Sequence, residues 1–141
     1  MTEPGRAGAG DFRPVRGRVV PIVLGIVIFV GAIALAIVLP EQYKAMDRLT
    51  CAGIGVAVAA FMSRYATIHA RPDEEGLYVR NLGAGEKVAW SDITAVRFSQ
   101  GMPWVRIDLE DGTDMAVMAI QRADGPRSLD EAQRLADLVG R

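Results

Sequence analysis

The sequence has few of the residues on which enzyme active sites and disulfide frameworks depend. Its 141 residues include one cysteine, Cys51, and one histidine, His69. A single cysteine excludes a disulfide within the chain and a metal site built from several cysteines. A nucleophile or general base needs a partner within hydrogen-bond reach, and the sequence offers none for Cys51 or His69. We therefore predict no catalytic residue, no metal site, no cofactor and no enzymatic activity.

The chain also lacks an excess of charge of one sign. Sixteen Lys and Arg residues nearly balance 17 Asp and Glu residues, and the formal net charge is −1. Nucleic-acid-binding domains carry a strongly basic face, so this balance argues against a nucleic-acid partner. Residues 1–18 contain four Arg against two acidic residues, whereas residues 63–141 contain ten Lys and Arg against thirteen Asp and Glu.

Residues 19–39 contain no charged residue and no Asn, Gln, Ser or Thr. An apolar run of about twenty residues is long enough for an α-helix to cross a hydrocarbon core of about 30 Å. We predict a transmembrane helix over 19–39. A cleaved signal peptide is the alternative, because basic residues precede the run and Ala34-Leu35-Ala36 resembles a cleavage site, but its apolar part is usually only about 7–15 residues long.

A second apolar run lies between Met46 and Arg64, after a connector at 40–45 that is too short for a domain. We predict a second span over 46–64 and hence a transmembrane helical hairpin. The pairs Gly53/Ala57 and Gly55/Ala59 have the small-xxx-small spacing that lets membrane helices approach closely. This face packs either on the first span, which we favour, or on a second copy of the chain in a homo-oligomer.

Basic residues flank the outer ends of the hairpin. Arg13, Arg16 and Arg18 precede the first span, and Arg64 and Arg71 follow the second. Cytoplasmic loops are enriched in Lys and Arg, so we predict a protein of the cell membrane with both termini in the cytoplasm. Residues 1–18 are rich in Gly, Ala, Arg and Pro, and we expect them to form a disordered basic tail.

Residues 66–141 alternate short β-type runs with turn signals, as in a small sheet or barrel. Asp111-Gly112 is the strongest hairpin signal. A two-residue turn there places Ala116, Met118 and Ile120 inward on the returning strand, and a three-residue loop places Met115, Val117 and Ala119 inward. Both registers remain open.

The chain ends in an amphipathic helix. Ser128 is the expected N-cap, with Glu131 completing a capping box, and Gly140 is the expected stop. The apolar stripe, which needs a surface to cover, consists of Ala132, Leu135, Ala136 and Val139. We predict an α+β membrane protein: a two-helix hairpin, then a PH-like sheet or barrel of five or six strands closed by this helix.

Five short segments of the sequence resemble those of a known family. They are Glu75-Gly76-Leu77-Tyr78-Val79-Arg80-Asn81, Val88-Ala89-Trp90-Ser91-Asp92-Ile93, Ala95-Val96-Arg97-Phe98, Trp104-Val105 and Leu109-Glu110-Asp111-Gly112. They resemble the bacterial PH domains of small two-span membrane proteins in actinobacteria, the low-molecular-weight protein antigens. The resemblance covers about residues 70–125 and the preceding hairpin. It implies a PH-like fold and a membrane anchor, and it implies no activity.

Two functions are compatible with such a module. The first is a platform for a protein partner, because a PH-like barrel offers an open sheet edge beside its helix where an extended peptide adds a strand. An exposed Trp104 would serve as an anchor for that partner, although Trp104 packs equally well under the terminal helix. The second is a sensor of anionic lipid or phosphoinositide, for which the first hairpin supplies Arg80 and Lys87.

Overall fold

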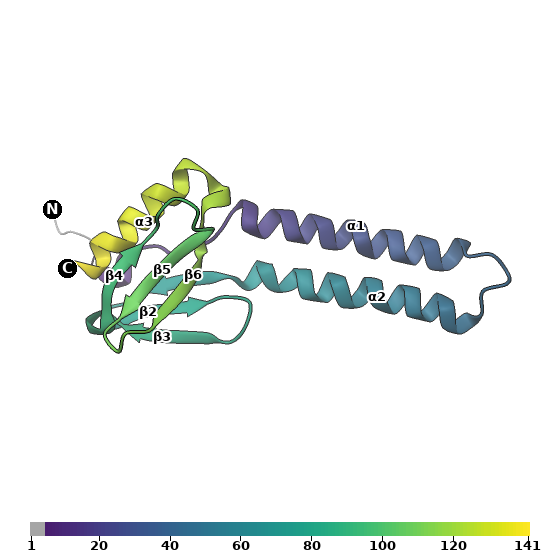
Figure 1. The fold of residues 1–141 in the computed structure, drawn as a ribbon, viewed down its shortest axis with the longest axis horizontal. Coiled ribbons are helices and arrows are strands. Elements are labelled where there is room, and N and C mark those ends of the chain that lie inside the picture. The colour runs from purple at the N-terminus through teal and green to yellow at the C-terminus, as the bar shows by residue number, and fades with distance from the viewer. Residues whose placement is uncertain (1–4) are drawn as a thin grey trace. The chain divides into compact units, whose positions relative to one another are not determined.

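The computed structural model describes residues 5–141, which form two compact units. One unit comprises residues 18–66 and the other combines residues 5–17 with 67–141. Figure 1 labels the three α-helices and the strands β2 to β6.

The smaller unit is a pair of helices, α1 (Arg16–Val38) and α2 (Ala45–Ser63). Both are long and apolar enough to cross a membrane, and only 6% of the most apolar window of each is buried. A core helix of a soluble protein would have that window mostly buried. The two predicted helices and the short connector between them are thus present, each beginning one to three residues earlier than expected.

The two helices pack closely where side chains are small. A Cβ atom on Gly55 would collide with the Cβ of Ala32, and one on Gly25 would lie 2.9 Å from the Cβ of Met62. Gly55 therefore faces α1 in the same chain, as we favoured, while Gly53 faces open space. Arg48 donates hydrogen bonds to the carbonyls of Ala36 (2.7 Å) and Ile37 (3.0 Å), which satisfies part of the C-terminal end of α1.

The larger unit contains two antiparallel sheets. The first has the strand order β1 (His69–Pro72), β2 (Gly76–Arg80), β3 (Gly85–Ala89), and the second has the order β4 (Ile93–Arg97), β5 (Trp104–Leu109), β6 (Asp114–Gln121). One 3-10 turn, η3 (Trp90–Asp92), links β3 to β4. Six strands agree with the predicted five or six, but they form two three-stranded sheets rather than one continuous ladder.

The core lies between these sheets and the terminal helix α3 (Pro126–Val139), which packs on β4 and β6 (Figure 1). Its fully buried side chains come from every layer: Phe12, Ile68, Leu77, Val105, Ile107, Val117, Ile120 and Leu135. Burial of this apolar surface stabilises the domain by about 25 cal/mol for each Å² removed from water.

The register of β5 and β6 follows the three-residue alternative. Val105 pairs with Val117 and Ile107 with Met115, and Gly112 has φ +85° in the connecting turn. Val117 and Ala119 are buried and Met115 is half-buried. A bulge between Trp104 and Val105 then shifts the pairing, so both Ile120 and Gln121 are also buried.

The start of α3 differs from the prediction. The helix begins at Pro126 after the N-cap Gly125, and Ser128 lies inside the first turn, where its hydroxyl donates to the Gly125 carbonyl at 2.6 Å. Proline suits the first helical position because its missing N–H has no partner there anyway. The buried stripe includes Ala132 and Leu135 as expected, but Leu138 takes the place expected of Val139. Gly140 is the C-cap, as predicted.

The N-terminal segment also differs from the expected disordered tail, of which residues 1–4 lie outside the described residues. Phe12 is completely buried, and its N–H and C=O exchange hydrogen bonds with Ala70 of β1 at 2.8 and 3.0 Å. The guanidinium of Arg134 lies 3.8 Å from the Phe12 ring centroid. Asp124 accepts hydrogen bonds from the N–H groups of Val15 (3.0 Å) and Arg16 (2.7 Å). One apolar residue within a polar segment thus anchors the segment to the domain.

We expect Phe12→Ala to lower the free energy of unfolding of the domain by about 3–5 kcal/mol, the usual cost of a cavity of this size. Urea unfolding of the full chain in detergent, followed by tryptophan fluorescence, measures this. Val15→Ala is the matched control, since Val15 is 45% exposed. Equal stability of the two variants would show that the segment does not belong to the folded domain.

Candidate functional site

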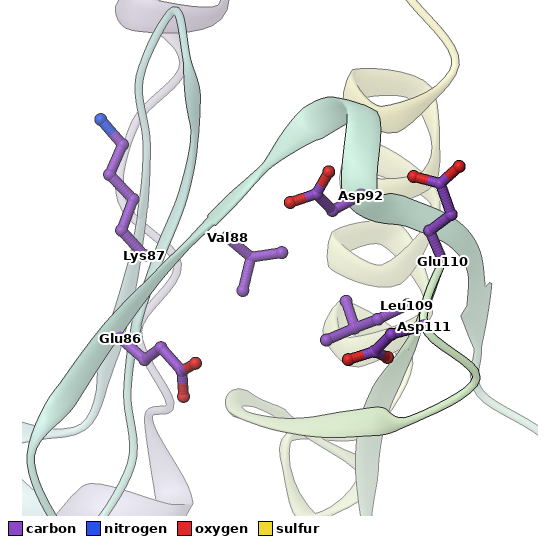
Figure 2. A pocket seen from close by; sticks show the side chains of 7 residues that line it. All are labelled: Glu86, Lys87, Val88, Asp92, Leu109, Glu110 and Asp111. Atoms are coloured by element: carbon purple, nitrogen blue, oxygen red, sulfur yellow. The ribbon is translucent and has the colours of Figure 1, made fainter.

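A groove of about 470 Å³ lies between the two sheets of the domain. One wall is β3, and the other is formed by the end of β5 and the turn that follows it (Figure 2). Seven residues line the groove: Glu86, Lys87, Val88, Asp92, Leu109, Glu110 and Asp111.

The β3 wall is an unpaired strand edge. In the first sheet β3 has β2 as its single neighbour. The ladder hydrogen bond from Trp90 N–H to the Glu75 carbonyl (3.1 Å) fixes the alternation, because paired and unpaired positions alternate in an antiparallel ladder. The N–H and C=O groups of Gly85, Lys87 and Ala89 consequently point away from β2. In the described part of the chain, no backbone hydrogen bond joins these groups to another strand.

Two of the other sheet edges have hydrogen-bonded partners. Phe12 pairs with the outer edge of β1, whereas α3 contacts β4 without a backbone hydrogen bond to it among the described residues. The amide of Asn81 closes the edge of β6: its Nδ2 donates to the Ala116 carbonyl at 2.9 Å and its Oδ1 accepts from Met118 N–H at 3.0 Å. A side-chain amide there takes the place of a neighbouring strand, whereas the edge of β3 beside the groove has no such partner in the described part of the chain.

The groove has an apolar floor and an acidic rim. Figure 2 shows Val88 and Leu109 pointing toward each other from opposite walls, while the amine of Lys87 points away from the groove. Four of the seven lining residues are carboxylates. The hydroxyl and the N–H of Thr113 donate to Asp111 at 2.6 and 2.9 Å and hold the pKa of that carboxyl below its usual value, which keeps it ionised at neutral pH.

The predicted cationic residues lie together on the other face of the first sheet. Arg80 and the side chain of Lys87 line a shallow depression of about 530 Å³, with His69 and Tyr78. The Lys87 ammonium lies 2.8 Å from Glu75 and 2.9 Å from Asp73, and these two partners raise its pKa. Its charge is therefore already compensated.

Arg80 and Trp104 have different surroundings. The Nε atom of Arg80 is buried and has no hydrogen-bond partner among residues 5–141. Trp104 is half-buried at the start of β5, at the opposite end of that strand from Leu109. The structure thus brings Arg80 and the Lys87 side chain together and leaves Trp104 apart.

The residues considered for chemistry have structural partners. His69 Nδ1–H donates to the Thr67 carbonyl at 2.8 Å, and Cys51 Sγ lies 3.5 Å from the Ala32 carbonyl. Within residues 5–141, no group of three or more His, Cys, Asp and Glu side chains is placed to hold a metal ion.

Sequence reasoning missed the acidic rim. Glu86 lies two residues before the buried Val88 on the same face of β3. A charged residue at an inward position of a strand was the available signal, because that face normally carries apolar side chains. The contribution of Glu110 and Asp111 to the same groove depends on how the two sheets pack.

Three residues of the strings that carry the family resemblance have specific structural roles. A Cβ atom on Gly76 would collide with the carbonyl of Val88 on the neighbouring strand. Asn81 closes the β6 edge, as described above. Trp90 is buried, and its Nε1–H donates to the Asp73 carbonyl at 2.8 Å, which ties the turn after β1 to the end of β3.

Two small sheets covered by a C-terminal helix define a PH-like domain, here carried by a chain with two helices long enough to span a membrane. Residues 69–138 match the family model described as "Bacterial PH domain". The domain at residues 69–138 belongs to the bacterial PH domain family, as the sequence resemblance implied.

Its relatives are mycobacterial proteins. An uncharacterized protein of Mycobacterium tuberculosis is 32% identical over 99 residues, which are 70% of this chain and 64% of that protein. Low molecular weight protein antigen 6 of the same species is 38% identical over 73 residues, or 52% of this chain and 62% of the antigen. The matched region therefore spans less than two thirds of either relative. No solved structure matches this chain.

The ion pair between Lys87 and Asp73, on the face of the first sheet opposite the groove, predicts a pH dependence. The pKa of Asp73 is lowered, first by the hydrogen bond from Lys87 and then by the Gly76 N–H. The resulting stability is fully present above the unfolded-state pKa of about 3.9 and is lost as the pH falls through the lower folded-state pKa. The raised pKa of Lys87 leaves the pair intact up to alkaline pH.

We expect Asp73→Asn to lower the melting temperature at pH 7, and we expect the difference from the unmodified chain to close as the pH falls below about 4. Asparagine keeps an acceptor oxygen for Gly76 but loses the charge. Thermal unfolding of both proteins between pH 2 and pH 8 measures this. A difference that is the same at pH 2 and pH 7 would mean that Asp73 acts through the turn alone.

Proposed function

We propose that this chain is a non-catalytic, membrane-anchored PH-like module that binds a protein partner by adding one of the partner's extended segments to the open edge of β3. The observation that carries the proposal is the unpaired edge itself, since the outward backbone groups of Lys87 and Ala89 lie beside the groove. Edge strands present unsatisfied donors and acceptors that an extended peptide can pair with.

The attachment of both chain ends to one domain supports a hairpin topology in the membrane. Residues around Phe12 fold together with residues 67–141, and the two apolar helices lie between these segments in the sequence. A chain whose two ends meet in one domain must cross a bilayer an even number of times. The basic residues at both outer flanks favour the cytoplasm for that domain.

Ala89→Pro tests strand addition with little disturbance of the fold. Ala89 has φ −67°, which matches the fixed φ of proline, and its N–H points away from β2. We expect the variant to fold as stably as the unmodified chain or slightly better. We expect it to reduce partner capture about tenfold, the result of losing one backbone hydrogen bond and crowding the edge.

A photocrosslinking amino acid at Glu86, in the full chain in its native membrane, measures that capture. Glu86 is exposed and lines the groove. Ala89→Ser, which keeps the N–H, is the matched control and should retain the crosslinked product. Equal crosslinking in the Pro and Ser variants would refute strand addition at β3.

Binding of an anionic lipid headgroup is the second candidate function, and it rests on Arg80. No carboxylate pairs with Arg80 in the described residues, and its Nε has no partner. The neighbouring Lys87 is paired with two carboxylates, which leaves few free cations for a phosphate.

If this second function operates, anionic lipid should raise the melting temperature of the unmodified chain in nanodiscs and should leave Arg80→Gln unchanged. Nanodiscs of purely zwitterionic lipid provide the reference. The same response of both proteins to anionic lipid would exclude a role for Arg80 in headgroup binding.

A further inference from the structure

We propose that the partner segment at β3 is cationic: the groove selects an extended protein segment with an apolar residue facing Val88 and Leu109 and Lys or Arg two residues away on the same face. This inference rests on the proposed function, because it assigns the chemistry of the segment that adds to the β3 edge. The charge around the groove and the two-residue periodicity of a strand determine this preference.

The charge around the groove is predominantly negative. Glu86, Asp92, Glu110 and Asp111 surround it, and the one cation among its seven lining residues, Lys87, extends from the other face of β3 to Asp73 and Glu75. Glu86 and Glu110 are exposed, and neither forms an ion pair within residues 5–141. These carboxylates attract a cationic segment and repel an acidic one.

The geometry of β3 sets where the charges of the partner must lie. In an antiparallel pair, residues opposite each other project to the same face. A partner residue opposite Val88 would enter the groove toward Leu109, and a residue two positions away would lie opposite Glu86. Intervening residues would project to the outer face with Lys87. The groove therefore contacts every second side chain of the partner segment.

The apolar floor of the groove is the reason why we expect the partner segment to carry an apolar residue as well as a cation. Val88 is buried, whereas Leu109 on the opposite wall is only half-buried. An apolar side chain inserted between them would remove the remaining exposed surface of Leu109 from water. A free cation or a short basic peptide without an apolar residue would lack that contribution.

The probe is the seven-residue peptide Thr-Lys-Thr-Val-Thr-Lys-Thr, whose side chains read the same in both directions. Its counterpart has Glu in place of both Lys residues. Fluorescence anisotropy of each labelled peptide with the full chain in nanodiscs measures the dissociation constants. We expect the Lys peptide to bind at least about tenfold more tightly than the Glu peptide at low salt and to weaken as salt is added.

Two sets of variants test the site. The double variant Glu86→Gln/Glu110→Gln should weaken binding of the Lys peptide about three- to tenfold, as expected for two exposed charge pairs. Glu74→Gln, which removes an exposed carboxylate outside the groove, is the matched control and should leave binding within about twofold. Ala89→Pro should weaken binding of the Lys peptide, and Ala89→Ser should not.

The outcomes separate this inference from the proposed function. If both peptides bind equally and Ala89→Pro blocks both, strand addition stands and the cationic preference is wrong. If Ala89→Pro leaves binding of the Lys peptide unchanged while Glu86→Gln/Glu110→Gln weakens it, the peptide only adsorbs to the acidic surface. Strand addition at β3 and the cationic preference of an added strand are then both wrong. If neither peptide binds, the cationic inference is overturned, while crosslinking at Glu86 still decides strand addition. Dimers of the full chain that Ala89→Pro abolishes would make the occupant a second copy and overturn the inference.

Discussion

The backbone groups at the edges of two small sheets are the constraint on which the rest of this domain depends. Three-stranded sheets leave edges that must be paired, covered or exposed to water. Phe12 pairs with β1, α3 lies beside β4, and the Asn81 amide occupies the donor and acceptor positions of β6. Each cover comes from a different part of the chain, so residues far apart in sequence cooperate in one core. The edge of β3 has no hydrogen-bonded partner among the described residues, and it lies beside the groove.

The covering of β1 also links the domain to the two apolar helices. Phe12 precedes the first apolar helix, and Ala70 follows the second. The segment that precedes the two helices in the sequence and the segment that follows them belong to one folded unit. The hydrogen bonds between Phe12 and Ala70 and the buried Phe12 ring hold them together. If the two helices span a membrane, as proposed above, a domain joined to both of them does not need lipid affinity to reach it. Recognition of a neighbouring protein is then a more useful role for the domain than recognition of lipid.

The pattern of ion pairs also favours a protein partner over a lipid headgroup. The two faces of the first sheet differ in how far their charges are compensated. On the outer face Lys87 has two carboxylate partners, and Arg71 pairs with Asp11 at 3.2 Å. On the groove face Glu86 has no cationic partner among residues 5–141, and Glu110 and Asp111 contribute further negative charge across the gap. Of the two cations expected to attract phosphate, Lys87 is paired with carboxylates and Arg80 is not, which leaves one available cation. The carboxylates of Glu86 and Glu110 beside the β3 edge form no ion pair among residues 5–141.

The sequence by itself determined what depends on local patterns: the two apolar helices, the alternation of the strands, the turn at Asp111-Gly112, the C-terminal helix and the family. Only the tertiary structure decided the burial of Phe12, the start of α3 at Pro126 instead of Ser128, the register of β6, and the gathering of Glu86 with Glu110 and Asp111. The physical reason is the separation in sequence between the residues that make the relevant contacts. Helix length and strand alternation come from neighbouring residues, whereas edge covering, register and a groove between two sheets come from contacts that the local sequence does not contain.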